Sequence, residues 1–279
     1  MNYFKTFTLM AVLTAVFVFV GNYFGGMHGM IYAFGFAVVM NFFSYWFSDK
    51  IVLAMYGAKE IKREDSKELY VMVSNLATKA GLPMPKVYII QDSMANAFAT
   101  GRDPHHAAVA VTAGILEILT PKQLEAVLAH EMTHIKNRDI LIGTLAATFA
   151  GAITMLARFA MFFGGGSRDN DKGGGLGMIL MFILAPIAAI LIQLAISRSR
   201  EYGADTGSAE LTGRPQELIG ALEALTASVK QRKAGPEVQP ATAHMFIVNP
   251  FSGDFFASIF STHPTLAQRK ANLEKRAGL

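Results

Sequence analysis

The feature that most constrains this chain is an uninterrupted run of 43 uncharged residues, from Thr6 to Ser48. A single helix of that length would measure about 65 Å, roughly twice the ~30 Å hydrocarbon core of a bilayer. The run must therefore break, and the stretch from Gly21 to Gly26 is the expected place. We predict that residues 1–48 form a transmembrane hairpin with spans at about 6–24 and 27–47.

A second apolar stretch covers residues 140–197, where the five charged residues are Arg158 and four in a glycine-rich loop. We expect a second hairpin there, with spans at about 140–160 and 177–197. The alternative is that these runs are buried core helices of a soluble protein, but four runs of this length favour membrane spans. The two hairpins hold only 6 of the 46 charged residues, so the overall charged fraction of 16% averages two different populations.

The polar segments 49–139 and 198–279 carry 11 and 10 of the 25 Lys and Arg residues. An even number of spans puts both segments and both termini on one side, and the positive-inside rule makes that side cytoplasmic. The net charge of +4 is too small to indicate nucleic-acid binding. Because the chain has no Cys, disulfides and thiolate metal sites are excluded.

The polar segments have the pattern of an α+β domain. Short strands are expected at Lys86–Gln91 and Ala107–Thr112, which are apolar and bounded by turn residues. A helix is expected from Pro121 to about Lys136, with Thr120 as its N-cap in a capping box. Residues 198–279 are expected to be mostly helical.

The motif that indicates catalytic chemistry lies in the helix expected from Pro121 to about Lys136. Residues 130–134 read His-Glu-Met-Thr-His, which is the pattern H-E-x-x-H. Residues four apart share one face of a helix, so both imidazoles can reach one metal ion. Glu131, next to the first histidine, can reach a water molecule on that ion. The alternative, two surface histidines on an amphipathic helix, is disfavoured because the complete motif rarely arises by chance.

A catalytic zinc site needs a third protein ligand, which in this chain must be His, Asp or Glu. Glu201 and Asp205 are four residues apart after the second apolar stretch, so on a helix they face the same way. Glu201 is the candidate third ligand, and Asp205 would then orient a ligand histidine through its other ring nitrogen. The spacing alone fits equally well a cluster of charges flanking a membrane span, such as Arg198 with Glu201.

Three motifs now stand together in the polar segments. They are H-E-x-x-H-x-x-N-x-D from His130 to Asp139, S-R-x-R-E-Y-x-A-D from Ser197 to Asp205, and S-T-H-P from Ser261 to Pro264. In these motifs the chain resembles the HtpX group of membrane-bound zinc metalloproteases, which are related to the CAAX prenyl proteases. The resemblance covers essentially the whole chain. It implies a mainly α membrane protein with four transmembrane helices and a cytoplasmic α+β catalytic domain that is zincin-like, of the gluzincin type, with a small sheet.

The resemblance also implies the roles of the site residues. His130, His134 and Glu201 would bind one Zn²⁺ per chain, with Glu131 as catalytic base and proton shuttle. The implied activity is that of a zinc metalloendopeptidase of the bacterial inner membrane, which takes part in protein quality control and the stress response. Its substrates would be misfolded or damaged membrane proteins and unfolded polypeptides.

Two further residues are carried over from the group. His263 matches a late histidine expected near the carbonyl of the peptide bond to be cleaved, and Asn137 matches an asparagine with a supporting role near the site. The group usually reads His-Pro-Pro at the first of these positions, whereas this chain reads His-Pro-Thr from His263.

Rival functions can be weighed on the same residues. A di-iron bundle needs a second E-x-x-H motif, and none of the other histidines supplies it. An intramembrane protease would bury the motif in the bilayer, which the charged residues around it disfavour: Lys122, Glu125, Lys136, Arg138 and Asp139. This intramembrane protease and a catalytically silent zinc-binding scaffold remain the alternatives.

Two segments are candidates for contact with the substrate, a sheet edge and a proline-containing stretch. An extended substrate can add to the edge of a sheet, and either Ala107–Thr112 or Asn96–Ala99 is a candidate edge, although an ordinary internal strand is equally compatible with the sequence. The proline-containing stretch at residues 235–250 fits either a lid over the site or a linker.

Overall fold

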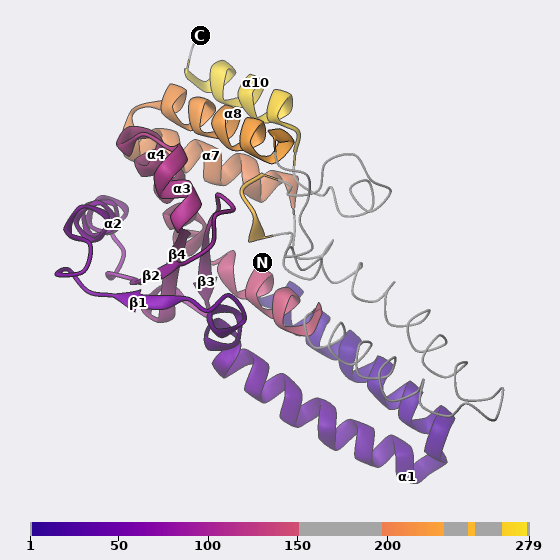
Figure 1. Cartoon of the computed structure of the whole chain (residues 1–279). Coiled ribbons are helices and arrows are strands. Elements are labelled where there is room, and N and C mark those ends of the chain that lie inside the picture. Colours follow the sequence, from indigo (N-terminus) through magenta and orange to yellow (C-terminus); the bar gives the residue numbers. More distant parts are fainter. Residues whose placement is uncertain (1, 151–196, 232–244, 249–263, 278–279) are drawn as a thin grey trace.

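The computed structural model describes residues 2–150, 197–231, 245–248 and 264–277 (Figure 1). The second half of the predicted span at 140–160 lies outside the described residues. The predicted span at 177–197, except its last position, and His263 also lie outside them.

The N-terminal hairpin consists of two antiparallel helical arms within α1 (Asn2–Met55). The helix breaks at Gly26, where φ is 55° and ψ is −143°, inside the stretch where the sequence predicted a break. Glycine adopts a positive φ without the steric cost of a Cβ atom. A Cβ atom added at Gly21 would lie 2.4 Å from the carbonyl oxygen of Gly29, so these glycines allow the two arms to touch.

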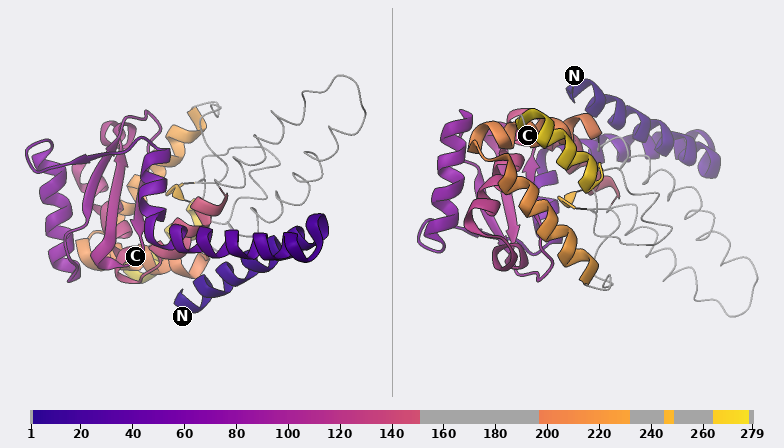
Figure 2. Two further views of the ribbon diagram at one scale, coloured as in Figure 1. Left: turned by 90° about the horizontal axis from the view of Figure 1, so that it is seen from below. Right: turned by 90° about the horizontal axis from the view of Figure 1, so that it is seen from above.

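Both arms of α1 are long and apolar enough to cross a membrane, at Thr6–Tyr23 and Gly25–Met55. The hairpin projects away from the sheet and from the helices at residues 67–80, 121–136, 198–231 and 266–277 (Figures 1 and 2). Its outer surface carries large apolar side chains, including Phe19 at 73% and Tyr32 at 76% exposure. Such a surface suits contact with lipid, where apolar side chains are favoured.

A shorter apolar helix, Ile140–Ala150, forms the first part of the third predicted span. It packs against α1 in a cluster of apolar side chains that contains Leu9, Leu13, Leu141, Ile142, Leu145 and Phe149. Thr144 of this helix also contacts the sheet, because its Oγ1 atom lies 3.0 Å from Oγ1 of Thr100. The helix therefore joins the N-terminal hairpin to the globular part.

A four-stranded sheet lies at the centre of the globular part, in the order β1-β2-β4-β3. Its strands are β1 (Lys59–Ile61), β2 (Lys86–Ile90), β3 (Ala97–Gly101) and β4 (Ala107–Thr112). The pair β2–β4 is parallel, and the other two pairs are antiparallel.

The position of β4 corrects one expectation. Ala107–Thr112 cannot serve as a docking edge, because β2 and β3 already pair with its two sides. Every residue of β4 is buried. Of the two candidate edges, the structure leaves the one that overlaps β3, which is an edge strand of the sheet.

Helices pack against both faces of the sheet. Ten of the 16 residues of α4 (Pro121–Lys136) are buried. It begins with the predicted capping box: Thr120 Oγ1 accepts from the Gln123 N–H at 3.3 Å, and Gln123 Oε1 accepts from the Thr120 N–H at 3.0 Å. The other helices are α2 (Lys67–Ala80), η1 (Pro104–His106), α3 (Ala113–Ile118), α7 (Arg198–Thr212), α8 (Pro215–Gln231) and α10 (Leu266–Ala277).

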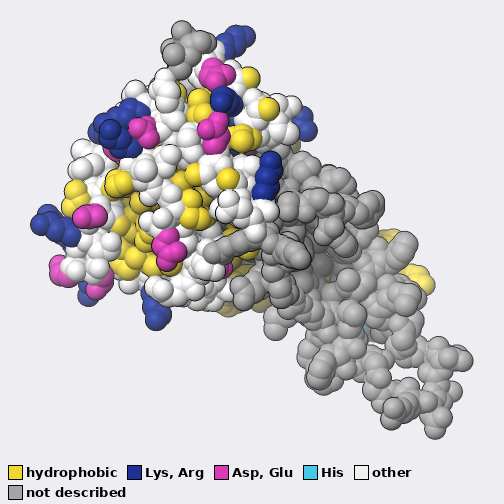
Figure 3. All heavy atoms as spheres, turned by 45° about the horizontal axis from the view of Figure 1, so that its top comes forward, with side chains coloured by type: hydrophobic (Ala, Val, Ile, Leu, Met, Phe, Trp, Pro, Cys, Tyr) yellow, Lys and Arg dark blue, Asp and Glu magenta, His cyan; other side chains and the backbone are white. Residues whose placement is uncertain are grey.

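The C-terminal helices α7, α8 and α10 stack together beside α4 (Figure 1). Side chains from α2, α4, α8 and the sheet form one large apolar core, which includes Val73, Val109, Met132 and Leu222. Charged side chains of both signs are interspersed over the face of the globular part seen in Figure 3. The globular part therefore has an apolar interior and, on this face, charged groups of both signs among its apolar side chains.

Candidate active site

The two histidines of the H-E-x-x-H motif lie one turn apart on α4 and point the same way. Their Nε2 atoms are only 3.2 Å apart. His130 is 2% exposed, and His134 is half-buried at the open side of the site. Helical spacing alone brings these two nitrogens together, as the sequence predicted.

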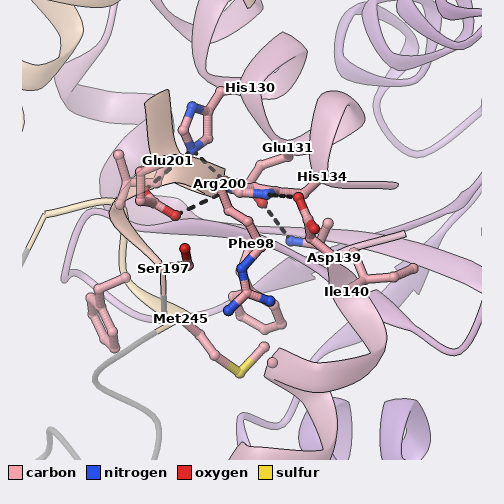
Figure 4. Close-up of a pocket in the computed structure, with 14 residues that line it drawn as sticks. Phe98, His130, Glu131, His134, Asp139, Ile140, Ser197, Arg200, Glu201 and Met245 are labelled. Atoms are coloured by element: carbon pink, nitrogen blue, oxygen red, sulfur yellow. Dashed lines mark hydrogen bonds and ion pairs between the residues drawn. The ribbon is translucent and has the colours of Figure 1, made fainter. Parts of the chain in front are cut away.

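Glu201 comes to the same point from α7 (Figure 4). Its Oε1 atom lies 3.5 Å from Nε2 of His134, and its Oε2 atom lies 3.8 Å from Nε2 of His130. Helix α7 comes this close because Gly207 faces α4. A Cβ atom added at Gly207 would lie 2.4 Å from the Thr133 side chain.

The distances fit a shared zinc ion. Two imidazole nitrogens bound tetrahedrally to one zinc, each at about 2.05 Å, lie about 3.3 Å apart. The ligand atoms of His130, His134 and Glu201 all lie within 4.8 Å of one another, and among the described residues this is the one such group of three side chains that could hold a metal ion. Three protein ligands with a fourth position left for water is the arrangement of catalytic zinc.

Each histidine is also held through its other ring nitrogen. His130 Nδ1 lies 2.9 Å from Oδ1 of Asp205, which is one turn after Glu201 on α7. His134 Nδ1 lies 3.3 Å from Oδ2 of Asp139. Because an ionised carboxylate only accepts, each Nδ1 atom carries a hydrogen, and Nε2 is the ring atom that would bind a metal ion after giving up any proton of its own.

Asp139 reaches His134 because the chain turns back directly after α4. Arg138 has a positive φ of 58°, and the Asp139 N–H donates to the His134 carbonyl oxygen at 2.9 Å. The side chain of Asn137 is exposed at this helix end, and Asn137 is not among the described residues that line the site. Sequence reasoning missed Asp139, and the available signal was its place in the H-E-x-x-H-x-x-N-x-D motif.

Glu131 lies beside the histidines, where its Oε2 atom accepts from the Ala99 N–H of β3 at 2.8 Å. Burial raises the pKa of the Glu131 carboxyl, although the neighbouring histidines oppose this shift. Burial lowers the pKa of His134, but the hydrogen bond to Asp139 and the charges of Glu201 and Glu131 outweigh it and raise the pKa to about 9. Three carboxylates, Asp139, Glu201 and Glu131, thus favour positive charge at His134, and such surroundings also suit a divalent cation.

A cavity opens over these groups. Its lining combines site residues with apolar side chains: Phe98, Ala99, His130, Glu131, His134, Asp139, Ile140, Gly143, Ser197, Arg200, Glu201, Met245, Phe246 and Ile247. Arg200 extends from α7 into the cavity (Figure 4). Within the predicted lid or linker, residues 245–247 form one wall of the cavity.

Arg269 of α10 is a second arginine near the site, after Arg200. It is buried behind His130, and sequence reasoning missed it. Its Nε atom donates to Asp205 Oδ2 at 2.9 Å, and its Nη2 atom donates to Asp205 Oδ1. The charge of Asp205 raises the pKa of Arg269 against the effect of burial. Burial raises the pKa of Asp205, but Arg269 and the hydrogen bond from His130 outweigh it and lower that pKa, so the carboxylate stays ionised.

Comparison with known proteins agrees with this geometry. The model of Peptidase family M48 matches residues 63–277. Among curated relatives, the Protease HtpX homolog of Persephonella marina is 53% identical over 99% of this chain and 98% of its own length. The Protease HtpX homolog of Thermococcus sibiricus is 53% identical over 98% of this chain and 95% of its own length.

Among solved structures, the crystal structure of S. mikatae Ste24p superposes with a TM-score of 0.53 at 20% identity. The match covers 98% of this chain and 65% of that one, and at this identity it shows a shared fold. With the family match over most of its length and the His-His-Glu group in place, the chain belongs to Peptidase family M48, as a homologue of the HtpX metalloproteases.

Proposed function

We propose that this chain is a multi-pass endopeptidase of the bacterial inner membrane that uses one zinc ion to cleave misfolded or damaged membrane proteins at the cytoplasmic face. The observation that carries the proposal is the lining of the cavity. It includes Ile140 and Gly143 from the first turn of the helix Ile140–Ala150, which packs on the N-terminal hairpin. A polypeptide in the cavity would therefore lie beside the membrane-embedded part.

The residues present fit the chemistry of peptide hydrolysis. His130, His134 and Glu201 would hold the ion. When bound, zinc lowers the pKa of a water molecule and polarises the carbonyl of the peptide bond. Glu131 would take the proton from the attacking water at its carboxylate and pass it to the leaving amine.

The cavity also offers a template for an extended substrate. Phe98 and Ala99 of the edge strand β3 line it, so a peptide added along β3 would place its backbone next to Glu131. By its motif, His263 is proposed to donate a hydrogen bond to the oxyanion that forms on the substrate.

The test is to reconstitute the chain in liposomes with one unfolded polypeptide in two forms, anchored by a membrane span or free in solution. The anchored form should be cleaved faster at equal concentration, because anchoring raises its concentration at the membrane surface. A metal chelator should stop cleavage of both forms, and the Glu131→Gln variant should cleave both at least about 10²-fold more slowly.

Each contrary result has its own meaning. Equal rates for the two forms would contradict a preference for membrane proteins. Cuts within the anchoring span would favour an intramembrane protease. A zinc-loaded native chain that cleaves neither form would favour a silent scaffold.

A further inference from the structure

Arg269 is the largest fully buried side chain among the described residues, at 2% exposure. A guanidinium group is costly to bury unless its donors are satisfied and its charge is paired. The guanidinium group of Arg269 donates hydrogen bonds to two different partners. Nε and Nη2 donate to the carboxylate of Asp205, and Nη1 donates to the carbonyl oxygen of Ile247 at 2.9 Å.

The bonds to Asp205 connect Arg269 to the proposed metal ligand His130. Asp205 Oδ1, which accepts from Arg269, also lies 2.9 Å from Nδ1 of His130. The Nη2 atom of Arg269 is 3.4 Å from the same Nδ1 atom. Arg269 therefore fixes the carboxylate that fixes the ring of His130, without contacting the metal position itself.

The bond from Nη1 connects Arg269 to the wall of the cavity at residues 245–247, hereafter the cleft wall. Besides the bond from Arg269, the side-chain amide of Asn96 binds its backbone. Asn96 Oδ1 accepts from the Ile247 N–H at 3.2 Å, and Asn96 Nδ2 donates to the Met245 carbonyl oxygen at 3.4 Å. Phe246 and Ile247 are buried and line the cavity. Arg269 and Asn96 thus hold the cleft wall from two segments that are far apart in the sequence.

We propose that Arg269 is a positioning residue that holds the zinc ligand His130 and the cleft wall together, so that metal binding and substrate binding depend on the same guanidinium group. The planar fork of arginine is needed for this, since lysine carries its charge at one point and cannot donate in parallel to a carboxylate and to a carbonyl beyond it. The proposal rests on the zinc peptidase function proposed above.

Three variants separate the link from Arg269 to His130 from the link to the cleft wall. Asp205→Asn removes the charge between Arg269 and His130 but leaves the hydrogen bond from Arg269 Nη1 to the Ile247 carbonyl oxygen. It should weaken zinc binding by about 10- to 100-fold, with the KM for a peptide substrate changed less than about twofold. Asn96→Ala removes two hydrogen bonds to the cleft wall and should raise KM about fivefold or more, with zinc affinity changed less than about twofold. Arg269→Lys should impair both quantities.

The matched control is Lys270→Gln, which removes the neighbouring cation of α10. Lys270 is exposed and pairs with Glu223 of α8 at 2.9 Å, away from the site. This variant should keep native zinc affinity and native KM. If Arg269→Lys changed only one of the two quantities, or neither, the proposed coupling would be overturned.

A second measurement does not depend on whether Arg269→Lys folds. In the full-length chain carrying Glu131→Gln, which avoids self-cleavage, hydrogen exchange at residues 245–248 is measured with and without zinc. Zinc should slow exchange of the Ile247 N–H about fivefold, and by less than about twofold when Asp205→Asn is added, at zinc saturation in both cases. Unchanged exchange on zinc binding, or equal slowing in both chains, would overturn the role of Arg269. A chain that takes up no zinc would instead overturn the zinc assignment itself, and this is read from the zinc content before exchange begins.

Discussion

At the scale of single residues, each histidine that faces the metal position is held by an aspartate behind it. Asp205 holds His130 at 2.9 Å, and Asp139 holds His134 at 3.3 Å. Such partners fix the ring tautomer and orientation, so the ligand nitrogens are in place before metal arrives.

The Asp139→Ala variant should therefore weaken zinc binding by about 10- to 100-fold, because His134 loses the acceptor that fixes its ring. The Asn137→Ala variant, two residues away with an exposed side chain, should change it by less than about threefold. Zinc affinity measured by competition with a chelator compares the two. A larger loss in Asn137→Ala than in Asp139→Ala would contradict the geometry of the helix end.

The sequence could predict these residues to different extents, and the reason is distance along the chain. His130 and His134 are found from helical spacing alone. Glu201 reaches the site only through the packing of α4 against α7. Its spacing to Asp205 alone was therefore equally compatible with an ordinary cluster of charges. The position of Asp139 beside His134 depends on the positive φ of Arg138, which no local sequence pattern predicts. Arg269 lies 139 residues from His130, and nothing in its own segment marks it as buried.

At the scale of elements, the site depends on the close packing of α4 and α7. Gly207 removes the side chain that would collide with Thr133, and Ser208 Oγ donates to the Ala126 carbonyl oxygen at 2.6 Å. This contact sets the distance between the histidines on one helix and Glu201 on the other. A small change in helix spacing would therefore reach the metal site.

Alanine substitutions at two glycines of α7 test this dependence. Gly207→Ala should destabilise the chain by about 1–3 kcal/mol, because the new Cβ atom would lie 2.4 Å from Thr133, and should also weaken zinc binding. Gly203→Ala is the matched control, since nothing lies within 4 Å of a Cβ atom there. It should be neutral or stabilising by up to about 1 kcal/mol, because alanine favours helix. Thermal unfolding in detergent and zinc titration measure both effects, and equal behaviour of the two variants would contradict the account.

Elements with local signals were predictable, and their spatial order was not. The capping box at Thr120 and the helix break at Gly26 follow from residues that are neighbours in sequence. The place of β4 between β2 and β3 is set by pairings across the sheet. For this reason the sequence could not tell that Ala107–Thr112 is internal and that β3 is the edge.

At the scale of the whole molecule, residues 140–197 lie between the two halves of the zinc site. His130 and His134 precede them, and Glu201, Asp205 and Arg269 follow them. The proposed topology puts both halves in the cytoplasm, with residues 140–197 crossing the membrane twice. Assembly of the site should then require correct insertion of this segment.

Because the chain has no cysteine, single-cysteine variants give a direct test of topology. Asn22→Cys, at the far end of the hairpin, should react in intact cells with a thiol reagent that cannot cross the inner membrane. Lys122→Cys, on the exposed start of α4, should react only after the membrane is permeabilised. Labelling of Lys122→Cys in intact cells would place the catalytic domain on the other side and contradict the proposed orientation.

The central claim is that this chain hydrolyses peptide bonds with one zinc ion and Glu131. The most direct measurement compares zinc content and cleavage of an unfolded polypeptide for the native chain and Glu131→Gln, purified side by side in detergent. Both should carry one zinc per chain. The native chain should cleave, lose activity with a chelator and regain it with zinc, while Glu131→Gln should be slower by at least about 10²-fold. Near-native turnover by Glu131→Gln, or native cleavage that a chelator does not affect, would contradict the account.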